Sequence, residues 1–151
     1  KKYPYLIIDL RNNYGGDIPI MTKIADLFLP KGCVISVDEM RFLNWTHRSK
    51  KEQILNFERI IILQNKNTAS ASESLIGALK ENLGNVISIG ETTFGKGIGQ
   101  YTLSLRRGFA VKATTLLWHT PHGNNIQGKG IKPDILYKEE NIIEFALSLL
   151  K

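Results

Sequence analysis

The sequence predicts an α/β fold in which a mixed sheet is flanked by helices and followed by a β-hairpin. Aliphatic runs at 6–10, 59–64 and 86–89 have the length and composition of buried strands. Segments with helical spacing of apolar residues follow the first two runs. Beyond residue 98 the spacing changes to the alternation of a hairpin. This order of strands and helices is typical of α/β proteins.

The first part of the chain is expected to alternate strand and helix. A buried strand over 6–10 ends in a turn over 11–16, and Asp17 can cap the helix that follows. Residues 33–43 then read as extended, and 44–53 as a polar, basic excursion. The apolar face of the helix is expected to hold Ile20, Met21, Ile24, Ala25 and Phe28.

The next part repeats this order. A second buried strand covers 59–64, and a helix is expected from about Ala71 to a stop at Gly84. A third strand covers 86–89 and ends in Gly90. Helical spacing is kept by the apolar residues Ala71, Leu75, Ile76, Leu79 and Leu83.

The last part begins with the hairpin. Residues 98–105 alternate apolar and polar side chains, and Arg107-Gly108 turns them into a partner strand over 109–117. Residues 120–134 are rich in Gly, Pro and Asn and are expected to be loop. An amphipathic helix over 141–150 closes the chain.

Length and composition favour one domain, residues 1–151, with a sizeable core. The longest aliphatic run, 60–63, is far too short to span a bilayer. The net charge of +6 is spread over short clusters without interleaved aromatic residues, so a solvated surface is favoured and no nucleic-acid partner is expected. We interpret the single Cys33 as a buried, inert thiol.

Ser70 is a candidate nucleophile because it falls where the second buried strand has turned into its helix. The N–H groups of a first helical turn have no intrahelical partner, and the helix dipole there favours negative charge. The next N–H, that of Ala71, is therefore a ready oxyanion donor. Taken alone, the local sequence favours a plain helix cap by Ser70 or Ser72.

Lys96 is the candidate base for this serine. It lies between two glycines in Phe94-Gly95-Lys96-Gly97, so backbone can approach closely and the side chain can point inward. A base lysine must be neutral part of the time, and burial beside Phe94 and Ile98 would promote this. Gln100 could hydrogen-bond the amine. Taken alone, the turn favours an ordinary exposed lysine.

Two other glycine turns allow more than one interpretation. The pair Gly15-Gly16 follows a strand end and can form an anion-binding nest, a second oxyanion donor, although a plain turn fits equally well. The stretch 90–97 nearly fits a phosphate-binding loop. Gly97 stands where that motif needs Ser or Thr, and a strand rather than a helix follows, so no nucleotide is expected.

A histidine-based triad is the weaker alternative. His47 lies in the basic excursion, His122 lies in a Pro/Gly loop, and His119 ends a strand without an obvious Asp partner. Asp9 is expected to be buried beside Arg11. No His, Cys or carboxylate pair has convincing metal-ligand spacing, so neither a metal nor another cofactor is expected.

With these residues identified, the chain resembles the C-terminal-processing (tail-specific) serine peptidases. The match rests on four blocks in the family's order: Leu6 to Gly16, Thr68-Ala69-Ser70-Ala71-Ser72-Glu73, Gly90-Glu91-Thr92-Thr93-Phe94-Gly95-Lys96-Gly97, and Ile126 to Asp134. Each block is weak alone, and together they are highly specific. The resemblance implies that Ser70, not Ser72, is the nucleophile, that Lys96 is the general base and that Gln100 orients it.

The resemblance also implies an oxyanion hole formed by the N–H of Ala71 and that of Gly15 or Gly16. It implies a crotonase-like (ClpP/crotonase-type) fold. Nothing in the sequence corresponds to the family's PDZ domain or its upstream core elements, so the chain is expected to be a partial peptidase core. Missing core strands would leave an exposed sheet edge, which favours a homo-oligomer.

The function expected from these observations is a serine endopeptidase that cleaves peptide bonds near substrate C-termini with a Ser/Lys pair. Its partners would be proteins or peptides with accessible C-termini, and the family implies a periplasmic or otherwise exported location. The alternative is a non-catalytic module that binds a ligand or peptide on the same fold. The intact set of Ser70, Lys96 and Gln100 argues against this alternative.

Overall fold

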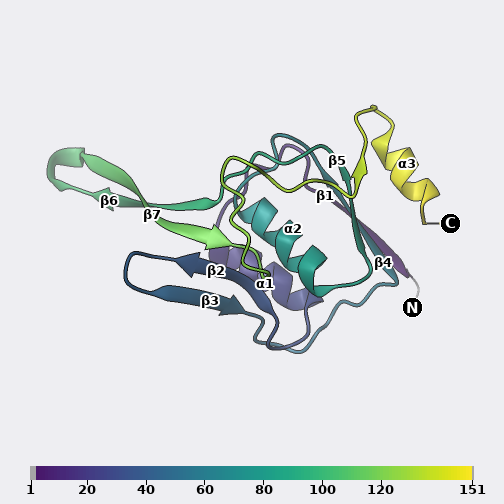
Figure 1. Ribbon diagram of the computed structural model, residues 1–151, viewed down its shortest axis with the longest axis horizontal. Coiled ribbons are helices and arrows are strands. Elements are labelled where there is room, and N and C mark those ends of the chain that lie inside the picture. The colour runs from purple at the N-terminus through teal and green to yellow at the C-terminus, as the bar shows by residue number, and fades with distance from the viewer. Residues whose placement is uncertain (1–2, 151) are drawn as a thin grey trace.

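The computed structural model describes residues 3–150 and contains eight strands and three α-helices (Figure 1). The first half holds β1 (Tyr5–Asp9), α1 (Ile18–Phe28), β2 (Val34–Glu39), β3 (Asn44–Arg48) and β4 (Arg59–Gln64). The second half holds α2 (Ala71–Asn82), β5 (Val86–Gly90), β6 (Ile98–Ser104), the 3₁₀ turn η1 (Arg106–Gly108), β7 (Ala110–His119), β8 (Ile135–Leu136) and α3 (Ile142–Ser148).

The strands divide between two sheets. One sheet is parallel, in the order β1-β4-β5-β8, and the other is antiparallel, in the order β3-β2-β7-β6. The mixed α/β fold with flanking helices and a hairpin is thus confirmed, with its parallel and antiparallel strands in separate sheets.

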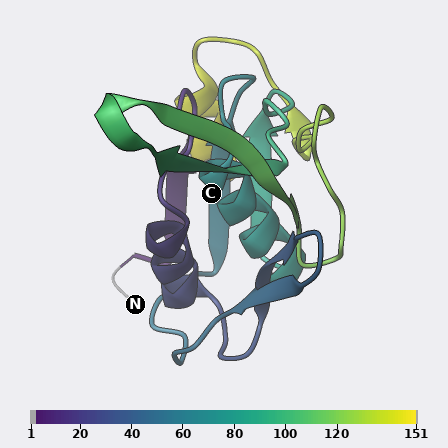
Figure 2. The same cartoon turned by 90° about the vertical axis from the view of Figure 1, so that its left-hand side faces the viewer.

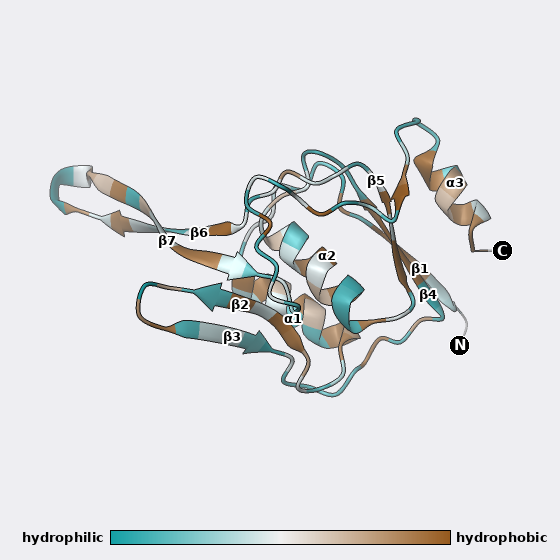
Figure 3. Ribbon diagram, in the orientation of Figure 1, coloured by the Kyte–Doolittle hydropathy of each residue, from teal (hydrophilic) through white to brown (hydrophobic). Residues whose placement is uncertain are grey.

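The parallel sheet is covered on both faces, which explains the continuous aliphatic runs of its strands. Ile60 and Ile62 of β4 join the cluster formed with α1 and α2, whereas Ile61 and Leu63 join the cluster beneath α3. The alternation follows from the two-residue period of a strand. Figure 3 shows apolar residues along these strands and along α3.

Helix α2 is buried from Ala71 to Leu79 and packs against α1 and β2. Helix α1 is capped as expected, because the side chain of Asp17 accepts a hydrogen bond from the N–H of Ile20. Its predicted buried face was too wide. Met21, Ala25 and Phe28 are buried, but Ile20 and Ile24 are 57% and 39% exposed. Each of these two isoleucines precedes a buried residue by one position, which turns its side chain around the helix axis and away from the buried face.

The antiparallel sheet contains one strand that the sequence did not predict. Residues 44–48, expected to be a polar excursion, form β3 and pair with β2. Their side chains are mostly exposed, so they show no alternation of apolar and polar residues. Cys33 lies just before β2 and is half-buried.

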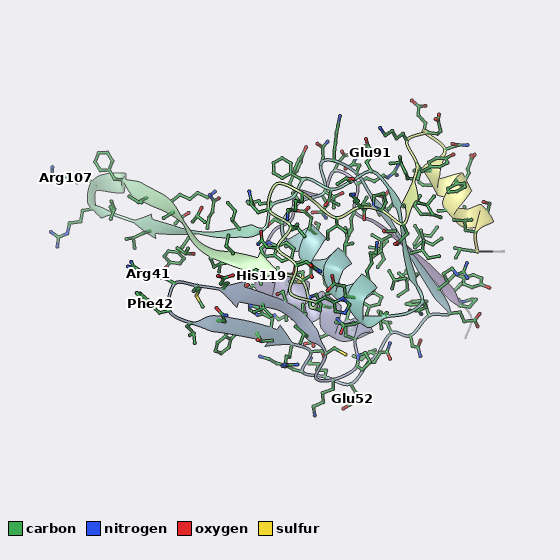
Figure 4. All side chains as sticks on the ribbon, in the orientation of Figure 1. Arg41, Phe42, Glu52, Glu91, Arg107 and His119 are labelled. Carbon is green, nitrogen blue, oxygen red and sulfur yellow. The ribbon has the colours of Figure 1, made fainter. Side chains whose placement is uncertain are left out.

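The β6–β7 hairpin is confirmed and projects from the body of the molecule (Figures 1 and 2). From Gln100 to Leu105 and from Phe109 to Thr115 its residues are exposed, including the apolar Tyr101, Leu103 and Val111. Figure 4 places Arg107 at its tip. Within residues 3–150 no helix has the length and apolar character needed to cross a bilayer.

The core packing predicts that alanine substitution of two isoleucines lowers stability by very different amounts. Ile62 is fully buried and Ile20 is 57% exposed. We expect Ile62→Ala to lower the free energy of unfolding by about 2–5 kcal/mol, because it removes buried methylenes and leaves a cavity. Ile20→Ala should cost less than about 1 kcal/mol. Urea denaturation measures both, and equal losses would contradict this core assignment.

The environment of Asp134 predicts that the folded state loses stability at low pH. Burial acts to raise its pKa, but hydrogen bonds from Ser88 and Lys80 hold the pKa of Asp134 below its usual value. A lowered folded-state pKa stabilises the fold above the unfolded pKa, about 4, and this stabilisation is lost as pH falls through the folded value. The stability deficit of Asp134→Asn, measured by urea denaturation, should therefore shrink below about pH 4. Parallel curves for the two proteins would refute this.

Candidate active site

A cavity of about 340 Å³ brings together four of the residues that the sequence singled out: Gly16, Ser70, Lys96 and Gln100. The other two candidate oxyanion residues, Gly15 and Ala71, line a neighbouring hollow that shares Gly16 with the cavity. Ser72 lines that second hollow and not the cavity. Of the two serines in the motif, only Ser70 therefore borders the cavity that contains Lys96.

Ser70 has an unusual backbone conformation. Its φ of 56° and ψ of −121° lie in a region that costs a non-glycine residue roughly 1–3 kcal/mol. The conformation turns the chain sharply from β4 toward α2. Neighbouring hydrogen bonds fix this turn: the Ala69 N–H donates to the Asn13 carbonyl at 3.0 Å, and the Phe94 N–H donates to the Thr68 carbonyl at 2.9 Å.

Gly15 lies directly against this turn. A Cβ on Gly15 would be 2.6 Å from the Ala69 carbonyl oxygen and 2.9 Å from the Ser70 Cβ, and its φ is +90°. No other residue fits there without moving the backbone. The glycine therefore lets the turn after β1 pack against the turn that carries Ser70.

Glu73 lies in the motif around Ser70, but its sequence position alone assigned it no role. Its side chain is fully buried. Its Oε2 accepts hydrogen bonds from the N–H of Ser70 at 2.8 Å and that of Lys96 at 2.9 Å. Its Oε1 accepts from the Gly95 N–H at 2.7 Å and from the Thr93 hydroxyl. One carboxylate thus joins the serine turn to the lysine turn.

The lysine turn is also held from its other side. The Trp118 indole N–H donates to the Lys96 carbonyl at 2.9 Å, and the Gly97 N–H donates to the Gln127 side chain at 2.9 Å. The Gly128 N–H donates to the Gly95 carbonyl at 2.9 Å. Residues of the fourth sequence block, 126–134, therefore help to fix the turn that carries Lys96.

The surroundings of Lys96 differ from the expectation in one respect. Lys96 is half-buried, but Phe94, which was expected to bury it, is itself 64% exposed. Within residues 3–150 no hydrogen bond joins the Ser70 hydroxyl or the Gln100 amide to the Lys96 amine. Catalytic hydrogen bonds often tighten only when substrate binds. A bulge between Gly99 and Gln100 interrupts the pairing of β6 with β7 beside the cavity.

The backbone donors distinguish Gly15 from Gly16. The Gly15 N–H donates to the Asn13 side chain at 3.0 Å. Among the described residues, neither the Gly16 N–H nor the Ala71 N–H donates a hydrogen bond to a protein acceptor. Two unpaired N–H groups thus lie beside Ser70, an arrangement that suits an oxyanion.

The histidines are paired elsewhere. His47 Nε2 lies 2.8 Å from Asp38 Oδ2, and His119 Nε2 lies 2.7 Å from Glu39 Oε2, a carboxylate partner that the sequence did not reveal. His122 lies near Glu81. None of the three histidines lines the cavity that contains Ser70.

The environment of Asp9 agrees only in part with the expectation. Asp9 is paired with Arg11 as expected, but it is exposed rather than buried. This ion pair with Arg11 lowers the pKa of Asp9. No group of three or more His, Cys, Asp and Glu side chains in residues 3–150 could hold a metal ion.

The buried carboxylate predicts a specific loss of stability. We expect Glu73→Ala to lower the free energy of unfolding by about 3 kcal/mol or more, because it leaves several buried donors without an acceptor. Glu52 is exposed, and Glu52→Ala should change stability by less than about 0.5 kcal/mol. Guanidinium denaturation compares the two. Equal stability of both variants would mean that Glu73 does not hold the turns together.

The family profile and the related sequences that match this chain agree with one another. The profile of peptidase family S41 matches residues 1–137. A probable CtpA-like serine protease of Staphylococcus aureus (strain N315) is 38% identical over 148 residues, which cover 91% of this chain and 29% of the relative. The chain thus spans less than a third of that relative's length.

Solved structures agree with the sequence matches. A photosystem II D1 C-terminal processing protease superposes with a TM-score of 0.81 at 32% identity, covering 91% of this chain and 35% of that protein. A lipoprotein from Streptococcus agalactiae superposes with a TM-score of 0.80 at 25% identity, covering 99% of this chain and 55% of that protein. Together with the profile match over most of its length, these likenesses show that the chain belongs to peptidase family S41.

Proposed function

We propose that this chain carries the catalytic centre of a serine endopeptidase that uses Ser70 as nucleophile and Lys96 as general base. The observation that carries the proposal is that both residues line one cavity while Glu73 accepts a hydrogen bond from the backbone N–H of each. Serine is a weak nucleophile near neutral pH and needs an adjacent base. None of the three histidines lines this cavity, so Lys96 is the candidate base there.

In the first step the Ser70 Oγ attacks the carbonyl carbon of the scissile peptide bond, and the Lys96 Nζ takes the hydroxyl proton. The carbonyl oxygen becomes negatively charged and accepts hydrogen bonds from the N–H groups of Ala71 and Gly16. We favour Gly16 over Gly15 because the Gly15 N–H is already donated to Asn13. A single donor of this kind typically contributes about 10²–10³ in rate.

In the second step the C–N bond breaks and Lys96 gives its proton to the leaving amine. The acyl group remains on Ser70 as an ester. Lys96, neutral again, takes a proton from water, whose oxygen attacks the ester carbonyl. The C–O bond to Ser70 then breaks, Lys96 returns its proton to the serine oxygen, and the new carboxylic acid leaves and loses its proton to water.

The substrate class follows from the relatives only by analogy. One solved relative is a C-terminal processing protease, and we propose that this chain likewise cleaves proteins or peptides near their C-termini. We also propose an exported location, in keeping with the lipoprotein among its structural relatives. The organisation as one partial peptidase core, residues 1–151, and a homo-oligomer that covers an exposed sheet edge stay predictions.

Covalent labelling tests the proposed pair. We expect a serine-directed phosphonate to label Ser70, because the attack on phosphorus needs the same base and oxyanion donors as the attack on carbon. Ser70→Ala should abolish labelling, and Lys96→Ala should reduce its rate by about 10² or more. Mass spectrometry of the digested chain locates the modified residue.

Two matched variants serve as controls. Ser72→Ala, which lines the neighbouring hollow and not the cavity, and Lys66→Ala, exposed and outside the cavity, should leave most of the labelling rate. Labelling at Ser72, or full labelling of Lys96→Ala, would refute the assignment. Absence of labelling in a chain that circular dichroism shows to be folded would favour the binding-module alternative.

A further inference from the structure

Three polar residues line the catalytic cavity but have no part in the proposed chemistry: Ser36 and Asp38 from β2, and Ser74 from α2. Ser36 and Ser74 are each 3% exposed, and the Asp38 side chain is 19% exposed. We call these three residues the polar subsite. Polar groups withdrawn from water are normally hydrogen-bonded, so the partners of these side chains decide what the subsite can do.

Within residues 3–150 the polar subsite leaves three oxygen atoms without a protein hydrogen bond. Neither serine hydroxyl has a protein partner, and Asp38 has one, since His47 Nε2 lies 2.8 Å from its Oδ2 while its Oδ1 has none. In the same part of the chain, Gln64 Oε1 is the one unpartnered side-chain atom that is sealed from solvent. The three free oxygens therefore open to accessible space, and the catalytic cavity is the hollow that all three residues line.

The polar subsite lies next to the candidate nucleophile. The Ser74 N–H donates to the Ser70 carbonyl at 2.9 Å, which places the two serines one helical turn apart on neighbouring positions of one helix face. Ser36 and Asp38 are two residues apart on β2 and so share a face of that strand. Because α2 packs against β2, the three residues form one wall of the cavity beside Ser70.

Asp38 carries the one negative charge among the cavity-lining residues. The other titratable residues that line the cavity are Lys96, Lys112 and Tyr101, and Lys112 is exposed. None of the ion pairs of residues 3–150 joins Asp38 to a lysine, and its partner is His47. While His47 is neutral, the pair carries one negative charge. A negative charge near Lys96 favours the protonated amine, which cannot act as a base, so a cation bound to Asp38 would assist the proposed chemistry.

We propose that the polar subsite binds the cationic side chain of a lysine or arginine, carried by the substrate residue whose carbonyl carbon Ser70 attacks. This inference rests on the proposed peptidase function. A lysine ammonium has three N–H donors, and the subsite offers three acceptors, the Asp38 Oδ1 and the hydroxyls of Ser36 and Ser74. The cavity of about 340 Å³ has room for such a side chain. An apolar side chain there would leave these acceptors unpaired, which disfavours it.

A pair of covalent probes tests this proposal. Two peptidyl phosphonates of identical sequence differ only in the side chain next to phosphorus, which is that of lysine in one and that of norleucine in the other. Norleucine has the same carbon chain without the ammonium group. We expect the lysine probe to label Ser70 about tenfold or more faster, because only its ammonium can pair with the subsite. Mass spectrometry of samples taken over time measures both rates.

Substitutions locate the preference. Asp38→Asn keeps the shape of the side chain and removes its charge, so it should bring the two labelling rates within about twofold of each other. The matched variant Glu52→Gln changes the net charge equally, but Glu52 is exposed and does not line the cavity, so the preference should remain. Ser74→Ala removes one acceptor that has no protein partner and should lower the preference about threefold. A preference that survives both Asp38→Asn and Ser74→Ala would refute the proposal.

The labelling pattern separates this proposal from the peptidase assignment. Equal labelling of Ser70 by the two probes, or faster labelling by the norleucine probe, would overturn the cation subsite and leave the nucleophile standing. A third probe with a glutamine side chain that labels as fast as the lysine probe would show that hydrogen bonding and not charge is selected, which also contradicts the proposal. Absence of labelling by every probe in a chain that circular dichroism shows to be folded would overturn both assignments.

Discussion

The buried carboxylate of Glu73 is the interaction on which the candidate active site depends. It accepts hydrogen bonds from the backbone of Ser70, Gly95 and Lys96 and from the Thr93 hydroxyl. Burial of a charge is costly unless donors replace its water, and these four donors do so. Two turns more than twenty residues apart in the chain are thereby fixed to the two oxygen atoms of one side chain.

The arrangement also keeps the carboxylate apart from the chemistry. Among the described residues, its partners are backbone N–H groups and a hydroxyl, and none is the Lys96 amine. A carboxylate that paired directly with the amine would favour its charged form, in which a lysine cannot take a proton. Glu73 instead orders the backbone of Ser70 and Lys96, and both residues line the cavity.

The sequence predicted the buried elements well and the exposed ones poorly. Strands β1, β4 and β5 are aliphatic runs covered on both faces, so composition alone identifies them. Strand β3 has mostly exposed side chains and therefore no periodic signal. Ile20 and Ile24 seemed to extend the buried face of α1, but only packing against α2 decides where that face ends.

The motifs predicted part of the candidate site. The four blocks identified Ser70 and Lys96 and narrowed the second oxyanion donor to Gly15 or Gly16, but the choice between the glycines depends on one hydrogen bond from Gly15 to Asn13. The role of Glu73 depends on contacts with residues 93–96 that no local pattern contains. Motifs thus identify the candidate reacting groups, whereas the contacts that hold those groups in place emerge only from the tertiary structure.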